Sequence, residues 1–212
     1  AMSPETGNLL ANLSGAGIKA EDIDTVILTH AHADHVGGLV NSDGRPAFPH
    51  AQYYIGKEEW EFWTGDPDLS GLAIAEDEKK MLIERAQESL APLANRVVFV
   101  DREQEIVPGI LAIPSPGHTP GHIAVGVYSQ SSALLDIADA ALHPIAIERP
   151  DWRSVFDMDW TQAGASLRRL MQRAYDDQML VFGYHFCFPC LGRVTPAGDG
   201  WQWQPGEMEL AA

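Results

Sequence analysis

One short stretch decides how the fold of this sequence is interpreted: Thr29-His30-Ala31-His32-Ala33-Asp34-His35. It places three imidazoles and one carboxylate within six residues. Neutral imidazole nitrogens and carboxylate oxygens are good ligands for zinc and similar divalent ions. In an extended backbone His30 and His32 point the same way, and Asp34 and His35 then lie on a turn where they can face a second ion. The stretch therefore predicts a metal site, but it cannot complete two coordination shells alone.

Candidates for the missing ligands occur farther along the chain. Each lies just beyond an apolar run, where a fixed backbone can aim a ligand. They are His118 and His122 in a turn rich in proline and glycine, Asp136 and Asp139 after one apolar run, and His185 after another.

The hydrophobic pattern around these residues mixes strands with helices. Residues 25–29 are apolar and β-branched, which predicts a strand that runs into the histidine-rich stretch. Apolar periodicity predicts helices over 76–93 and 161–175, the second with Asp159 as its N-cap. This mixture predicts the α/β or α+β class. The other predicted elements are a short helix over 6–13 and strands over 51–55, 96–100, 110–113, 123–128, 133–135 and 179–182.

Composition limits the function classes. The 212 residues predict one domain, and 14 Lys and Arg against 30 Asp and Glu give a formal charge of −16. An acidic surface repels nucleic acid and anionic membranes, and no apolar run approaches the roughly 18–20 residues of a membrane span. The two cysteines, Cys187 and Cys190, exclude a disulfide scaffold. Since no signal peptide is evident, we expect a cytoplasmic protein.

The ordered motifs resemble a known family. The pattern His30-x-His32-x-Asp34-His35 resembles the signature of the metallo-β-lactamase superfamily, and Gly117-His118, Asp139 and His185 follow in that family's order. Residues 156–159, 184–194 and 200–203 resemble the methyl parathion hydrolase-like and lactonase-like branch. The resemblance covers nearly the whole chain. It implies a single hydrolase domain over residues 1–212, folded as an αβ/βα sandwich with metals at one edge.

The resemblance also implies the ligand assignment and the cofactor. Asp139 is chosen over Asp136 because Ala138-Asp139-Ala140 resembles the family's Gly-Asp-Ala stretch. We expect two divalent ions, zinc first, with manganese, iron or cobalt as alternatives. His30, His32 and His118 would hold the first ion, Asp34, His35 and His185 the second, and Asp139 would bridge them.

The expected reaction is hydrolysis of a small molecule. Two ions about 3.5–4 Å apart share a water and lower its pKa towards about 7, and the resulting bridging hydroxide attacks a carbonyl or phosphoryl centre. Asp34 would orient this nucleophile, and Tyr184 would donate to an oxyanion or leaving group. We expect small esters, lactones or phosphotriesters as substrates. The alternatives are thioester hydrolysis of the glyoxalase II-like type and a metal-binding but catalytically inactive truncated form.

Other side chains near the motifs have simpler expected roles. His122 is expected to orient a ligand loop rather than to bind metal, and His50 and His143 to be structural or exposed. Cys187 and Cys190 are expected to be two partly buried thiols after His185, although their spacing also admits a redox pair.

The N-terminus departs from the family pattern. Only 29 residues precede His30, where family members carry several strands of the first sheet. We therefore expect a chain that is N-terminally short and lacks those strands. Because exposed strand edges favour association, we expect a homodimer.

Overall fold

The computed structural model describes residues 7–149, 151–152 and 154–206, which fall into two compact units. The N-terminal unit comprises Ala1–Asp68 and Ala75–Phe99, and the C-terminal unit comprises Leu69–Ile74 and Val100–Ala212. Both units combine strands with helices, which confirms the predicted α/β class. The single domain over 1–212 stays a prediction. Within the described ranges, no helix is both long enough and apolar enough to cross a membrane.

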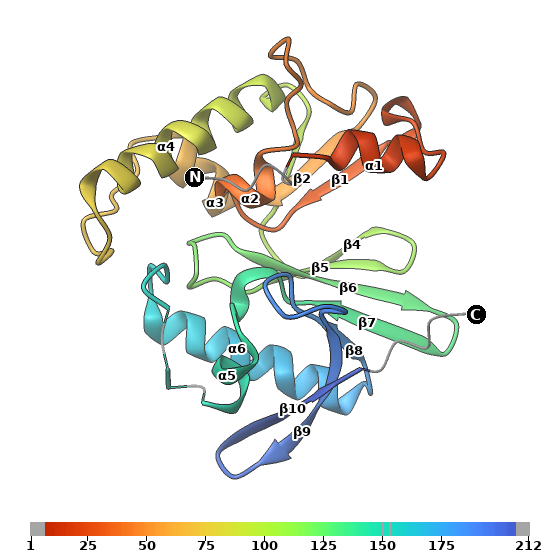
Figure 1. Ribbon diagram of the computed structural model, residues 1–212, viewed down its shortest axis with the longest axis vertical. Coiled ribbons are helices and arrows are strands. Elements are labelled where there is room, and N and C mark those ends of the chain that lie inside the picture. Colours follow the sequence, from red (N-terminus) through yellow and green to blue (C-terminus); the bar gives the residue numbers. More distant parts are fainter. Residues whose placement is uncertain (1–6, 150, 153, 207–212) are drawn as a thin grey trace. The chain divides into compact units, whose positions relative to one another are not determined.

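The N-terminal unit contains a three-stranded sheet with the order β1-β2-β3 (Figure 1). β1 and β2 are parallel, with Thr25 opposite Gln52 and Leu28 opposite Ile55. The strands are β1 (Thr25–Leu28), β2 (Gln52–Gly56) and β3 (Val97–Val100), the last residue of which belongs to the C-terminal unit. The helices are α1 (Leu9–Gly15), α2 (Ala33–Val36), α3 (Lys57–Thr64) and α4 (Glu76–Leu90), with 3-10 turns η1 (Ala20–Asp22) and η2 (Ala91–Leu93).

Two helices of this unit differ from the sequence-based prediction. The helix expected over 6–13 is α1, which begins at Leu9; residue 6 lies outside the described residues. The helix expected over 76–93 ends as α-helix at Leu90 and continues as the 3-10 turn η2, which contains Pro92. Proline has no N–H and collides with the carbonyl four residues earlier, so the α-helix cannot continue through it.

The C-terminal unit contains a seven-stranded sheet with the order β10-β9-β8-β7-β6-β5-β4 (Figure 1). Its paired strands are antiparallel except for β7 and β8, which are parallel. The strands are β4 (Gln104–Val107), β5 (Ile110–Pro114), β6 (Ile123–Ser129), β7 (Ser132–Asp136), β8 (Leu180–Phe182), β9 (Leu191–Ala197) and β10 (Gly200–Pro205).

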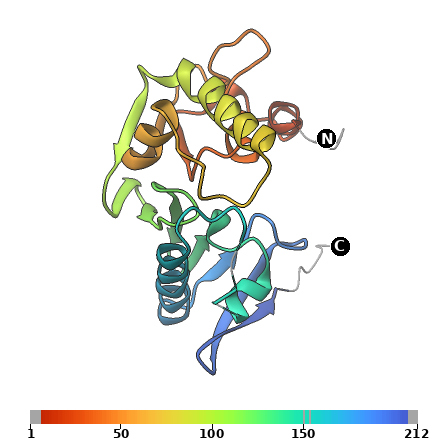
Figure 2. The same cartoon turned by 90° about the vertical axis from the view of Figure 1, so that its left-hand side faces the viewer.

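Helices α5 (Pro144–Glu148) and α6 (Trp160–Asp176) share one hydrophobic core with this sheet. Leu167 and Met171 of α6 are buried in the same cluster as Leu135 of β7 and Val181 of β8. Figure 2 shows α6 running alongside the sheet. The predicted N-cap is confirmed, since Asp159 Oδ1 accepts a hydrogen bond from the Gln162 amide at 2.9 Å.

The sheet topology brings distant residues to one edge. β5 ends and β6 begins at this edge, since the two strands are antiparallel neighbours joined by the turn that contains His118. β7 is antiparallel to β6 and parallel to β8, so β7 and β8 both end at the same edge. The 3-10 turn η3 (Ala138–Ala140) follows β7 and carries Asp139, while His185 follows β8. Three predicted ligands therefore lie at one edge of the sheet.

Candidate metal centre

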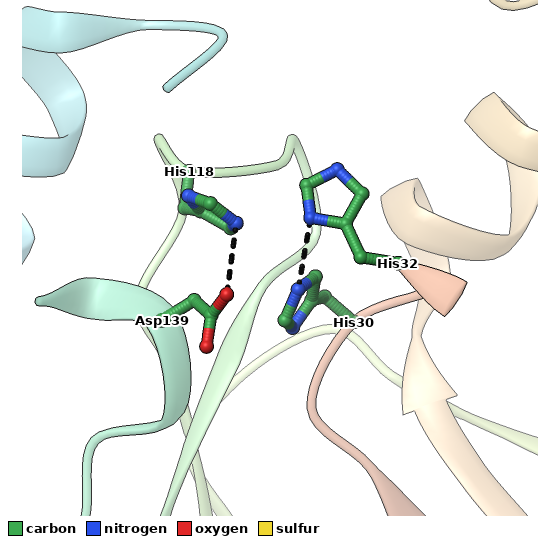
Figure 3. Close-up of side chains that lie close together, drawn as sticks. All are labelled: His30, His32, His118 and Asp139. Atoms are coloured by element: carbon green, nitrogen blue, oxygen red, sulfur yellow. Dashed lines mark hydrogen bonds and ion pairs between the residues drawn. The ribbon is translucent and has the colours of Figure 1, made fainter. Parts of the chain in front are cut away.

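The first ligand pair lies where β1 ends. The chain leaves β1 at Leu28 and enters α2 with His32 as the extended N-cap residue. His30 and His32 are buried, at 0% and 6% exposure. Nε2 of His30 lies 3.1 Å from Nδ1 of His32 (Figure 3). The two imidazoles therefore face each other, away from solvent.

Asp34 and His35 extend this group on α2. The His35 ring centroid lies 4.1 Å from that of His30, and His35 Nε2 lies 3.6 Å from Asp34 Oδ2. The Asp34 side chain is 47% exposed, whereas that of His35 is 8% exposed. We refer to the four residues as the N-terminal ligand set: His30, His32, Asp34 and His35.

The C-terminal ligand set consists of His118, Asp139 and His185. Asp139 Oδ2 lies 3.3 Å from Nε2 of His118 (Figure 3) and 3.4 Å from Nε2 of His185. His118 and Asp139 are buried, whereas the side chain of His185 is 35% exposed. Asp136, the other candidate, accepts a hydrogen bond at Oδ1 from the Ala138 amide. The structure thus places the carboxylate of Asp139 beside two imidazoles.

The other ring nitrogen of His118 contacts a second carboxylate. Nδ1 lies 3.0 Å from Asp157 Oδ1, and Asp157 Oδ2 accepts a hydrogen bond from the Ser154 amide. Burial opposes protonation of His118, but the hydrogen bonds and negative charges of Asp139 and Asp157 outweigh it and raise its pKa to about 9. The surroundings of His118 therefore favour a positive charge at this buried position.

His122 supports the ligand set through the backbone. Its Nε2 accepts a hydrogen bond from the Asp139 amide at 3.2 Å, and its Nδ1 lies 2.8 Å from the Ser115 hydroxyl. This agrees with the predicted role of orienting a ligand segment. His50 and His143 are exposed; His50 Nδ1 contacts the carbonyl of Glu21, and His143 caps α5.

The remaining predicted residues follow β8. Tyr184 is 45% exposed, and its ring lies edge-on to that of His185 at 4.9 Å between centroids. Cys187 is an exposed free thiol. Cys190 is a half-buried free thiol and donates to the Phe186 carbonyl at 3.1 Å.

The donor atoms of both sets suit divalent ions. They are imidazole nitrogens and carboxylate oxygens, the types that zinc accepts most often besides thiolates. In the C-terminal set, the buried carboxylate of Asp139 lies beside two imidazoles, and a bound cation would neutralise its negative charge. By donor chemistry, the side chains fit metal ions.

Two buried or half-buried carboxylates next to the ligand sets were not predicted from the sequence as site residues. Asp157 occurs in a segment whose only signal was family resemblance, and Glu59 lies in α3, where no helix was predicted. Both contact their ligand loops across long sequence separations, 39 residues for Asp157 and 28 for Glu59. Spacing patterns report local neighbours and cannot find such partners.

Comparison with known proteins shows the family. The sequence profile of the metallo-beta-lactamase superfamily matches residues 2–183. The chain belongs to this superfamily, which confirms the predicted family. An N-acyl homoserine lactonase of Bacillus cereus is 26% identical over 182 residues, covering 85% of this chain and 63% of that protein. The chain therefore spans less than two thirds of the length of this relative.

Solved structures support the same branch. AidC, described as a dizinc quorum-quenching lactonase, is 28% identical with a TM-score of 0.88, covering 98% of this chain and 72% of AidC. The hydrolase AbOPH of the beta lactamase superfamily is 25% identical with a TM-score of 0.81, covering 96% of this chain and 71% of AbOPH. The lactonase-like branch expected from the motifs is thus confirmed.

Proposed function

We propose that this chain is a metal-dependent hydrolase that opens neutral lactones, with both units acting as one hydrolase domain. The observation that carries the proposal is the buried carboxylate of Asp139 beside the imidazoles of His118 and His185. Membership of the metallo-beta-lactamase superfamily and similarity to lactonases support it.

Two zinc ions are the proposed cofactors, as in the dizinc neighbour AidC. Manganese, iron and cobalt remain alternatives, because histidine–carboxylate sites accept all of them. The proposed ligands are His30, His32 and His118 for one ion and Asp34, His35 and His185 for the other, with Asp139 shared.

The side chains have distinct roles in the proposed reaction. Two divalent ions would supply a nucleophile at neutral pH by acidifying a shared water, and they would polarise the substrate carbonyl. Asp157 accepts from Nδ1 of His118 and so leaves Nε2 as the ligand nitrogen. The partly exposed carboxylate of Asp34 would orient the nucleophile. Tyr184, which is 45% exposed, would donate from its hydroxyl to the developing oxyanion.

A hollow next to Asp139 supports a neutral substrate with a short apolar arm. The hollow lies within the C-terminal unit and has a volume of about 230 Å³. Its walls are mainly apolar and include Leu142, Trp152, Trp160 and Leu167. Ligand pockets usually hold about 300–1,000 Å³, so this one suits only a small group. Together with the net charge of −16, the apolar walls disfavour anionic substrates.

The experiment is metal analysis combined with a substrate panel. Protein purified without chelator should contain two equivalents of metal and hydrolyse N-hexanoyl homoserine lactone. A chelator should abolish this turnover, and added zinc should restore it. Esters, thioesters and phosphotriesters in the panel test the other substrate classes. Protein with no metal and no uptake of zinc or manganese would contradict the proposal, while metal without turnover would indicate the inactive alternative.

Two further expectations belong with this proposal. We propose a homodimer, which sedimentation equilibrium would test, and a cytoplasmic location, which fractionation of the source cells would test.

A further inference from the structure

Glu59 is a buried carboxylate that the proposed ligand assignment does not use. It lies in the first turn of α3, and its side chain is 0% exposed. Its Oε1 accepts two hydrogen bonds, one from the backbone amide of Ala31 at 2.9 Å and one from the indole N–H of Trp63 at 2.7 Å. Ala31 is the residue between His30 and His32. Glu59 therefore ties α3 to the backbone at the centre of the N-terminal ligand set.

Trp63 also links Glu59 to the imidazole ring of His32. The Trp63 indole is fully buried and lies edge-on to the His32 ring, with 5.6 Å between ring centroids and 73° between planes. The bond from the indole N–H to Glu59 fixes the orientation of this ring. One carboxylate oxygen thus restrains both the backbone that precedes His32 and an aromatic wall beside its imidazole.

Fold stability alone is a poor explanation for a glutamate at this position. Removing a carboxylate from water is energetically costly, and apolar residues of similar volume are often as stabilising as buried ionic groups. Two charge-assisted hydrogen bonds offset part of this cost. A glutamate at position 59 is therefore better explained by its contacts with the N-terminal ligand set than by packing of the core.

We propose that Glu59 is a positioning residue for His30 and His32. By holding the Ala31 amide and the Trp63 indole, it keeps the two imidazoles facing each other at the end of β1. The inference rests on the proposed function, because it requires these histidines to bind metal. Removing groups that orient metal ligands typically lowers metal affinity about 10–100-fold.

The test compares zinc affinity between two substitutions. Glu59→Leu removes both acceptor bonds, so zinc affinity should fall about 10–100-fold. Glu59→Gln keeps an amide oxygen that can accept both bonds, so most of the affinity should return. Zinc dissociation constants are measured by competition with a chromophoric chelator. The absorption spectrum of the Co²⁺-loaded protein reports the ligand geometry independently of turnover.

Tyr53→Phe is the matched control. Tyr53 is equally buried, lies in β2 of the same unit, and donates to the Phe48 carbonyl at 3.0 Å. The control should lower the free energy of unfolding of the metal-free protein but leave the zinc affinity unchanged. A Glu59→Leu protein that folds and binds zinc as tightly as this control would overturn the inference.

Two further measurements distinguish failure of the inference about Glu59 from failure of the proposed function. If Glu59→Leu does not fold without metal, Glu59→Asp replaces it, because the shorter side chain keeps the charge but cannot span both donors. Unchanged zinc affinity in Glu59→Asp would then overturn the inference. Wild-type protein that takes up no zinc overturns the proposed function itself, whatever the variants do.

Discussion

The N-terminal ligand set comes from one stretch of six residues, whereas the C-terminal set comes from three loops spread over residues 118–185. In the first set, the end of β1 and the short helix α2 present all four side chains. In the second set, the ligands are neighbours only because β5, β6, β7 and β8 are adjacent in one sheet. Local backbone geometry builds one set, and strand pairing builds the other.

The supporting contacts differ in the same way. Glu59 holds the N-terminal set through the backbone of Ala31. In the C-terminal set, Asp157 contacts the His118 ring directly and His122 holds the backbone of Asp139. Loss of Asp157 should therefore act directly on a ligand side chain, whereas loss of Glu59 should act through the backbone of Ala31.

Removing His118 should have the largest effect on metal binding. His118→Ala deletes a proposed ligand and removes the ring that the buried Asp139 and the half-buried Asp157 both contact. Zinc affinity should fall by more than the roughly 100-fold upper limit for groups that only orient ligands. Calorimetric zinc titration and metal analysis measure the loss. His50→Ala, at an exposed site, should change neither quantity, and equal losses in both variants would contradict the assignment.

Gly117→Ala should disturb the C-terminal set through the backbone. Gly117 has φ +132°, and an added Cβ would lie 2.0 Å from the Ala163 nitrogen and 2.4 Å from its Cα in α6. Because both atoms are backbone, the clash cannot be relieved by a side chain, and we expect a loss of about 3 kcal/mol in the free energy of unfolding. Urea denaturation of the metal-free protein measures it.

Gly15→Ala is the corresponding change in the N-terminal unit. Gly15 ends α1, and an added Cβ would meet nothing within 4 Å. Stability should stay constant or rise by about 0.4–1 kcal/mol, because alanine restricts the unfolded chain. Equal effects at the two glycines would show that the loop of His118 is not tightly packed against α6.

The contrast between local backbone geometry and pairing of distant strands also explains which elements could be predicted from the sequence. The strand at 25–29 and the helix at 161–175 match β1 and α6, because their periodicity is local. β9 and β10 were not predicted, since Gly192 and Pro196 interrupt β9 and both strands depend on pairing with each other. α3 was missed because three of its eight residues, Trp60, Phe62 and Trp63, are aromatic and have only modest helix propensity.

Predictability of the site follows the same rule. The N-terminal ligand set is visible in the sequence, since its members share one short motif. The C-terminal ligands could be assigned only by resemblance, because the pairing of β5 to β8 brings them to one edge. Asp157 and Glu59 depend on contacts between segments far apart in the chain, for which one sequence holds no local signal.

Asp157→Ala should have a smaller effect than loss of a ligand. The variant removes the acceptor of His118 Nδ1, so zinc affinity should fall about 10–100-fold. In the metal-free protein it also removes one of two negative charges beside the ring, so the pKa of His118 should fall from about 9. NMR titration of the metal-free protein measures the second effect.

The pH dependence provides the check on this variant. A histidine whose folded pKa lies above its ordinary value of 6.5 contributes stability that is present below pH 6.5 and is lost as the pH rises through about 9. The metal-free wild type should therefore lose stability over this range, and Asp157→Ala should lose less. Identical profiles of stability against pH for the wild type and Asp157→Ala would show that Asp157 does not hold the His118 ring. As a control, Asp157→Asn should retain part of the zinc affinity.

Glu103→Gln should have the smallest effect, because it changes a surface ion pair that includes no residue of either ligand set. Both carboxylate oxygens of Glu103 contact the Arg173 guanidinium at 2.7 and 2.8 Å, and the hydrogen bond from Arg173 lowers the pKa of Glu103 below 4.5. The Glu103 side chain is 43% exposed, so screening by solvent limits the pair to about 0–1 kcal/mol. A carboxyl with a depressed pKa contributes stability above pH 4.5 that is lost as the pH falls through its folded pKa. Urea denaturation of metal-free wild type and variant should therefore show a small difference at pH 7 that vanishes in acid, and a difference that grows in acid would contradict this account of the pair.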